Sequence, residues 1–144
     1  MIVNQISVFI ENAPGSMSSL TRLMRENDIN IRALCIAEVN NFGILRMIVN
    51  DVYATSSVLK NAGYVFKITP VLAVPLKDEA GGLGVVLDVL GDSGINVEYI
   101  YAFTASQKGK AYVVLRVEDN EKAIKVLAEH HCTPVSQAEL DIDS

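Results

Sequence analysis

Residues 11–31 read ENAPGSMSSLTRLMRENDINI and join two apolar stretches through a Pro-Gly turn and a helical pattern. The segment before it, QISVFIE, alternates in the way that is typical of a strand. After Pro14 and Gly15, apolar residues recur at Met17, Leu20 and Met24, which is helical spacing. The following segment, INIRALCIAEV, predicts a second strand. The rest of the chain can be interpreted from this order of strand, turn, helix and strand.

The same pattern returns 66 residues later, where residues 77–97 read KDEAGGLGVVLDVLGDSGINV. At this offset Gly15 aligns with Gly81, and Asn30 aligns with Asn96. A period of about seventy residues is too long for a solenoid unit and indicates a duplicated small domain. We therefore expect two domains, at residues 1–70 and 71–144. The apolar helix positions align as well: Met17, Leu20 and Met24 fall on Leu83, Val86 and Leu90.

Each half predicts the element order βαββαβ. The fourth strand of the first half, YVFKI, runs past Thr69 and Pro70 into VLAVPL, the first strand of the second half. The second half ends with the helix NEKAIKVLAEHH and a last strand from about Thr133. This order is the ferredoxin-like topology, so the predicted class is α+β with two antiparallel sheets. Apolar residues occur on both faces of several strands, which indicates that the halves pack together, that the chain forms a homodimer, or both.

Composition narrows the functional classes. Half of the residues are apolar, and no apolar run approaches the roughly 20 residues of a membrane span. We therefore expect a cytoplasmic protein without membrane contact. The net charge of −5 argues against a nucleic-acid partner, because phosphate binding needs a basic face. The spacing of Cys35 and Cys132 fits no zinc site, so both are interpreted as buried free thiols. No cofactor is expected.

The first loop has the features of an anion site. Gly15 allows close approach of the backbone, and the N–H groups that start the following helix attract an anion such as a carboxylate. Asn12 offers both a donor and an acceptor, and Asn30 could lie close to the loop or face it across an interface. Together they would suit a zwitterion. On turn chemistry alone, a plain turn and an ordinary residue at the start of a strand remain the alternative interpretation.

The NAPG turn, the helix and the INI strand inside βαββαβ resemble an ACT domain, as found in the regulatory modules of 3-phosphoglycerate dehydrogenase and aspartokinase. The resemblance covers the whole chain as two tandem copies without a catalytic domain. It implies that an amino acid binds at an interface between paired modules and regulates an enzyme or another protein. The second copy has Asp78 for the asparagine and Ala80 for the proline, so we expect binding chiefly at the first loop. The candidate ligand-binding residues are Asn12, Ala13, Pro14, Gly15, Ser16, Asn30, Asp78, Gly81 and Asn96.

Two alternatives remain beside a non-enzymatic amino-acid sensor. One is a small enzyme of the acylphosphatase type, which shares this topology but needs an arginine in the first loop, and residues 12–15 contain none. The other is a purely structural dimerisation module. His130 and His131 end a predicted helix, and the chain has no third histidine to complete a metal site. No motif combines a nucleophile with a base, so we expect no catalytic activity.

Overall fold

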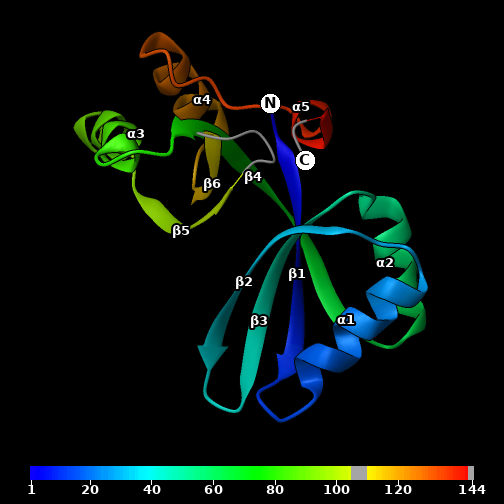
Figure 1. Cartoon of the computed structure of the whole chain (residues 1–144). Coiled ribbons are helices and arrows are strands. Elements are labelled where there is room, and N and C mark those ends of the chain that lie inside the picture. The colour runs from blue at the N-terminus through cyan, green and yellow to red at the C-terminus, as the bar shows by residue number, and fades with distance from the viewer. Residues whose placement is uncertain (105–109, 143–144) are drawn as a thin grey trace. The chain divides into compact units, whose positions relative to one another are not determined.

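A computed structural model describes residues 1–104 and 110–142 (Figure 1). The predicted α+β class is confirmed by its strands and helices. None of the described helices is long and apolar enough to cross a membrane. In chain order the elements are β1 (Val3–Glu11), α1 (Ser16–Glu26), β2 (Ile31–Val39), β3 (Phe42–Val49), α2 (Val52–Asn61), β4 (Val65–Lys77), α3 (Gly82–Asp92), β5 (Val97–Thr104), β6 (Lys110–Val117), α4 (Asn120–Glu129) and α5 (Gln137–Ile142).

The chain divides into two compact units. We call Asn4–Thr69 the N-terminal unit, and Met1–Val3 together with Pro70–Ser144 the C-terminal unit. β4 is one continuous strand through the division, as the sequence predicts for the segment around Pro70. The domain limits 1–70 and 71–144 stay a prediction. The two units differ from these limits at Met1–Val3 and at Pro70, all of which belong to the C-terminal unit.

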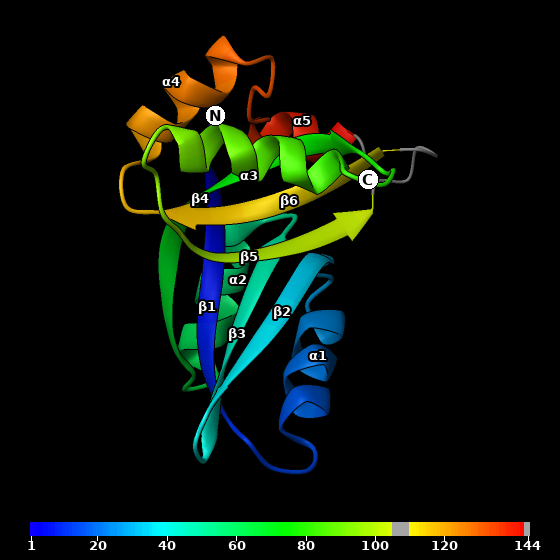
Figure 2. The same ribbon diagram turned by 90° about the vertical axis from the view of Figure 1, so that its left-hand side faces the viewer.

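In the N-terminal unit the strands lie in the order β2-β3-β1-β4, and β3 runs antiparallel to both of its neighbours. Helices α1 and α2 cover one face of this sheet (Figures 1 and 2). Every second residue of β1 and every fourth residue along α1 point into the space between them, which matches the periods of a strand and a helix. The core consists of Ile6, Val8, Ile10, Leu20, Met24, Ile29, Leu45, Met47, Val49 and Leu59.

In the C-terminal unit β4 pairs with β6 and β6 pairs with β5, all antiparallel. Helices α3 and α4 contact each other, and their apolar residues share a core with β4 and β6. Two of the three aligned pairs of helix positions lie in the cores, Leu20 with Val86 and Met24 with Leu90, whereas Leu83 is 40% exposed. The core consists of Leu72, Val74, Val86, Leu90, Val113, Leu115, Val117, Ala123 and Leu127.

The two units also repeat their helix ends. α1 and α3 both follow a glycine with φ of +85°, Gly15 and Gly81, a left-handed conformation that glycine adopts without strain. α2 and α4 both have an aspartate as their N-cap, Asp51 and Asp119, whose side chain accepts a hydrogen bond from the N–H three residues on. Such N-caps satisfy backbone donors that the helix itself leaves without partners.

The predicted last strand from about Thr133 is wrong. Only Val135 pairs there, where its N–H donates to the carbonyl oxygen of Ala73 at 2.8 Å, and helix α5 follows at once. Pro134 has no N–H to add to a ladder. Ser136 and Glu139 form a capping box, in which the Glu139 N–H donates to Ser136 Oγ at 3.2 Å and the Ser136 N–H donates to Glu139 Oε1 at 3.3 Å. These local hydrogen bonds favour a helix start over continued strand pairing.

Candidate functional site

The first loop connects β1 to α1 at one end of the N-terminal unit. The helix begins at Ser16 with Gly15 as its N-cap, so Pro14 lies in the turn before the helix. A Cβ on Gly15 would meet only Ser18 Oγ, at 4.0 Å. The glycine is therefore required by its left-handed conformation, and not by lack of space. Asn12 is exposed, and its backbone N–H donates to the carbonyl oxygen of Asn41 in the β2–β3 turn at 2.9 Å.

The start of α1 leaves backbone donors available. The Ser16 N–H donates to Ala13 and the Ser19 N–H to Gly15, whereas the amides of Met17 and Ser18 have no acceptor among the described residues. The first turn contains no acidic residue. The helix dipole adds partial positive charge at this end, so an anion would be stabilised here.

A hollow of about 340 Å³ lies beside this helix start. Of its polar lining, sequence analysis singled out Ser16 but not Glu11, Ser19 or Tyr64, which the fold brings together from different parts of the chain. Glu11 ends β1, two serines occupy the first turns of α1, and Tyr64 follows α2. Its lining residues are Phe9, Ile10, Glu11, Ser16, Ser19 and Tyr64.

The second loop has the same position in the C-terminal unit but a tighter backbone. The Glu79 N–H donates to the Lys77 carbonyl oxygen at 2.9 Å, and the Gly82 N–H donates to the Glu79 carbonyl oxygen at 3.1 Å. The Lys77 carbonyl oxygen lies where a Cβ on Gly82 would stand. The first loop carries Ser16 at the position of Gly82, so it does not share this close approach.

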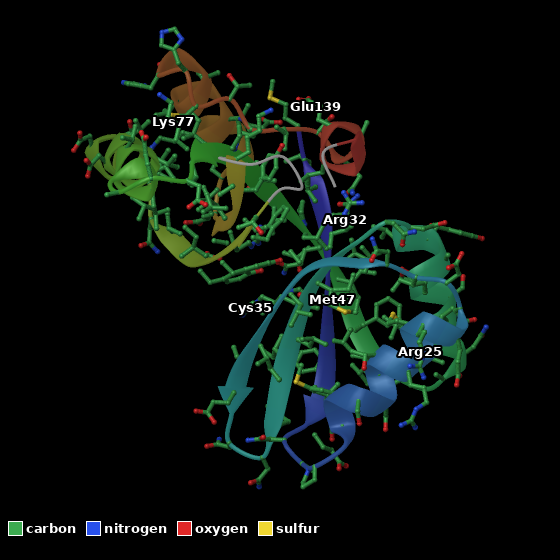
Figure 3. All side chains as sticks on the ribbon, in the orientation of Figure 1. Arg25, Arg32, Cys35, Met47, Lys77 and Glu139 are labelled. Atoms are coloured by element: carbon green, nitrogen blue, oxygen red, sulfur yellow. The ribbon has the colours of Figure 1, made fainter. Side chains whose placement is uncertain are left out.

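The second loop also has a hollow, of about 330 Å³. At the repeat offset it corresponds to the first, but its chemistry differs because Lys77 stands in place of Glu11. Figure 3 labels Lys77, the last residue of β4. His131 and Cys132, which follow α4, line the second hollow, whereas Tyr64, which follows α2, lines the first. The lining residues are Pro75, Leu76, Lys77, Glu79, Gly82, Val85, Val86, His131 and Cys132.

Asn12 and Asn30 lie at opposite ends of the N-terminal unit. Glu11, next to Asn12, pairs with Phe42 at the start of β3, whereas Ile31, next to Asn30, pairs with Val49 at the end of β3. β3 is eight residues long, so the two ends are roughly 25 Å apart. One amino acid cannot contact both asparagines of the same unit.

At its own end, Asn30 is tied to Asn50, a residue that sequence analysis did not single out. The Asn30 N–H donates to Asn50 Oδ1 at 3.0 Å, and the Asn50 N–H donates to the Asn30 carbonyl oxygen at 3.1 Å. In the C-terminal unit Asp78 and Gly81 are likewise at the end of the sheet opposite to Asn96, because Lys77 pairs with Lys110 and Val97 with Val117. Asn96 lines a hollow with Glu98, Glu118, Asp119 and Lys122.

The remaining sequence candidates have structural roles. Cys35 and Cys132 are free thiols as expected, but both are half-buried and not fully buried. His130 caps the end of α4, with Nδ1 2.9 Å from the Val126 carbonyl oxygen. Within residues 1–104 and 110–142, no three His, Cys, Asp or Glu side chains come together as a metal site. Among the aromatic residues of β5, Phe103 stacks on Tyr112 with ring centroids 5.3 Å apart.

Comparison with known proteins gives the family. The family model of the ACT domain pair matches residues 1–142. The chain belongs to the ACT domain pair family. The predicted architecture of two tandem ferredoxin-like ACT domains is thereby confirmed. No curated protein matches the chain.

Solved structures with this architecture include a protein from Bacteroides thetaiotaomicron, which is 35% identical with a TM-score of 0.90 and covers 97% of this chain and 96% of its own. The ligand-free regulatory subunit of aspartate kinase from Thermus thermophilus is 16% identical with a TM-score of 0.61, covering 88% of this chain and 91% of its own. The corresponding subunit from Thermus flavus is 15% identical with a TM-score of 0.57, covering 89% and 92%. At these low identities, the two aspartate kinase subunits show likeness of fold alone.

Proposed function

We propose that this ACT domain pair is a non-enzymatic regulatory or sensor protein that binds a free amino acid and controls an enzyme or another protein partner. We further propose that it acts as a cytoplasmic homodimer and needs no cofactor. The observation that carries the amino-acid proposal is the start of α1, where the amides of Met17 and Ser18 are available and no acidic side chain stands in the first turn. These donors suit a ligand carboxylate.

The neutral amide of Asn12 supports the same ligand class. Its side chain is exposed and makes no hydrogen bond with any described residue, so it can both donate to a carboxylate and accept from an ammonium group. Glu11, which lines the adjacent hollow, supplies a negative charge for that ammonium group. Since Asn30 lies at the far end of the unit, we propose that it reaches the ligand only across an interface with a second copy of the chain.

The second loop is the weaker candidate. Asp78 and Glu79 place negative charge where the first loop has Asn12 and Ala13, and this charge repels a carboxylate. In addition, the Lys77 carbonyl oxygen lies against Gly82 at the start of the helix, where a Cβ would stand. We therefore propose that the amino acid binds chiefly through residues 12–16.

The test is a thermal-shift screen of the twenty amino acids, followed by calorimetry with the best ligand. Losing a hydrogen bond to a charged ligand group costs about 1.5–3 kcal/mol. We therefore expect Asn12→Ala to raise the dissociation constant roughly ten- to a hundredfold. The matched control is Asp78→Ala, which should bind as the unchanged protein does. Loss of binding with Asp78→Ala alone would assign the site to the second loop, and a screen without any response would favour the structural dimerisation module.

A further inference from the structure

The outer side of α1 carries two arginines that have no partner in the described part of the chain. Arg22 and Arg25 are exposed, and their guanidinium groups form no hydrogen bond or ion pair with any described residue. A guanidinium group is planar and always charged, and it can bind a carboxylate through two parallel hydrogen bonds. Two such groups on one helix are therefore available to an acidic partner. The other three arginines of the chain interact within it: Arg32, Arg46 and Arg116.

The two arginines belong to a polar strip along α1 that we call the basic face: Ser18, Thr21, Arg22 and Arg25. These residues share one side of the helix, because they follow the spacing i, i+3, i+4 and i+7. Ser18 Oγ donates to the Gly15 carbonyl oxygen at 3.1 Å, and Thr21 Oγ1 donates to the Ser18 carbonyl oxygen at 3.2 Å. The two hydroxyl groups are thus used inside the helix, and the arginines supply the free donors.

Two hollows border the basic face. One, of about 330 Å³, is lined by the four residues of the face itself. The other, of about 520 Å³, reaches from α1 to the start of β2, where Asp28 and Asn30 line it. Thr21 and Arg25 line both hollows, and Figure 3 labels Arg25 on α1. Hollows on either side of a row of side chains give room to the side chains of a second helix.

The fold does not require the basic face. At the repeat offset, the positions that α1 buries are also buried in α3, whereas the outer positions have different chemistry. Asp88 stands in place of Arg22, which reverses the charge, and Gly91 stands in place of Arg25. A helix in the same place of the second copy therefore forms without either arginine. The charge of the basic face is a property of the N-terminal unit alone.

The two units also differ in overall charge. The N-terminal unit has 6 Lys and Arg residues and 5 Asp and Glu residues, whereas the C-terminal unit has 6 and 12. The chain as a whole therefore repels an acidic partner, and the attraction is local to the basic face. Such a local patch orients an incoming partner and selects it by charge.

We propose that the basic face binds an acidic helix of the protein that this chain controls. Arg22 and Arg25 are three residues apart, which is ~4.5 Å along the helix axis. Acidic residues three or four apart on a second helix have nearly the same spacing and share one side of it. Asp28 repels carboxylates at the far end of the larger hollow, so the acidic residues face the arginines. This inference rests on the proposed control of a partner protein but not on the amino-acid ligand.

A synthetic peptide tests the face. The probe is an alanine-rich helical peptide with blocked ends and glutamates four residues apart along one side. Its comparator has the same composition, with the glutamates spread around the helix. In a titration followed by amide chemical shifts, the probe should shift residues 18–31 of the protein and bind more tightly than the comparator. Salt at 1 M should abolish binding, because it screens exposed charges beyond ~3 Å.

Paired substitutions test the arginines. Arg22→Gln together with Arg25→Gln should raise the dissociation constant of the probe about tenfold, since each exposed ion pair contributes up to about fivefold in affinity. The matched control is Lys60→Gln together with Lys67→Gln, which removes the same charge from exposed positions of the same unit and should bind as the unchanged protein does. If circular dichroism shows that the arginine variant does not fold, the comparator peptide and the salt titration decide.

The possible outcomes separate this face from the amino-acid site. Absence of probe binding, equal binding of the two peptides, or equal loss in both double variants would overturn the basic face. None of these results bears on the thermal-shift screen or on the calorimetry of Asn12→Ala. Probe binding at residues 18–31 in a protein that responds to no amino acid would keep the basic face and remove the sensor.

Discussion

Two glycines in α3 should respond to the same substitution in opposite directions. Gly82 begins the helix, and a Cβ added there would collide with the carbonyl oxygen of Lys77 and come within 3.7 Å of Leu76 Cδ1. Gly84, two residues later, would place its Cβ in open space with no heavy atom within 4 Å. We therefore expect Gly82→Ala to destabilise the protein and Gly84→Ala to stabilise it.

The magnitudes follow from two effects. Alanine is favoured over glycine in a helix by about 0.5–1 kcal/mol, and at Gly84 this is the whole effect. At Gly82 the obstacle is the carbonyl oxygen of Lys77, which accepts a hydrogen bond from the Glu79 N–H at 2.9 Å. The loop must therefore shift to make room for a Cβ, and overpacking of this kind costs about 1–3 kcal/mol. Because the helix preference is common to both sites, this overpacking cost is the expected difference in unfolding free energy between the two variants.

Urea denaturation followed by circular dichroism measures this difference. Both glycines lie in the C-terminal unit, so the same transition reports on both, and an unchanged m-value shows that the midpoint reflects stability. Ser16→Ala is the control in the first loop, where the equivalent position already carries a Cβ, and its effect should stay within about 0.5 kcal/mol. If Gly82→Ala were as stable as Gly84→Ala, the Lys77 carbonyl oxygen would not lie close to Gly82. The backbones of the two loops would then not differ in the way described above.

The repeat allowed most of the fold to be predicted. The helical spacing of Leu20 and Met24 and its return at Val86 and Leu90 predicted helices that the structure contains, with these residues in the two cores. The sequence also predicted that the strand YVFKI continues past Pro70 into the apolar run VLAVPL, although proline is uncommon inside sheets.

The strand predicted from about Thr133 was wrong because the βαββαβ order of the first copy was applied to the last residues of the second copy. The residues described after α4 contain no full strand, and the local sequence from Ser136 to Glu139 carries a capping-box signal that favours a helix. Reading that signal together with Pro134 would have predicted helix α5. Local hydrogen bonds can decide the structure of a short terminal segment, since few tertiary contacts oppose them.

The separation of Asn12 and Asn30 follows from topology and could have been predicted. In a βαβ unit the two strands run parallel, so the loop after the first strand and the start of the second lie at opposite ends of the sheet. The tight backbone of the second loop could not be predicted in this way. It depends on the Lys77 carbonyl lying against Gly82, a contact between residues whose spacing carries no pattern.

Two further predictions concern the helix ends. Asp28 has φ of +56° at the position that Gly94 occupies in the second copy, so Asp28→Val should destabilise by about 1–2 kcal/mol while Asp28→Gly is tolerated, as thermal melts would show. Asp51→Ala removes the acceptor of the Ala54 N–H, at 2.9 Å, and should cost about 1 kcal/mol in urea denaturation. Asp119→Ala should cost a similar amount, and because each cap is satisfied inside its own unit, the double variant should lose the sum, about 2 kcal/mol. A double variant no less stable than either single one would show that the two helix starts do not make independent contributions.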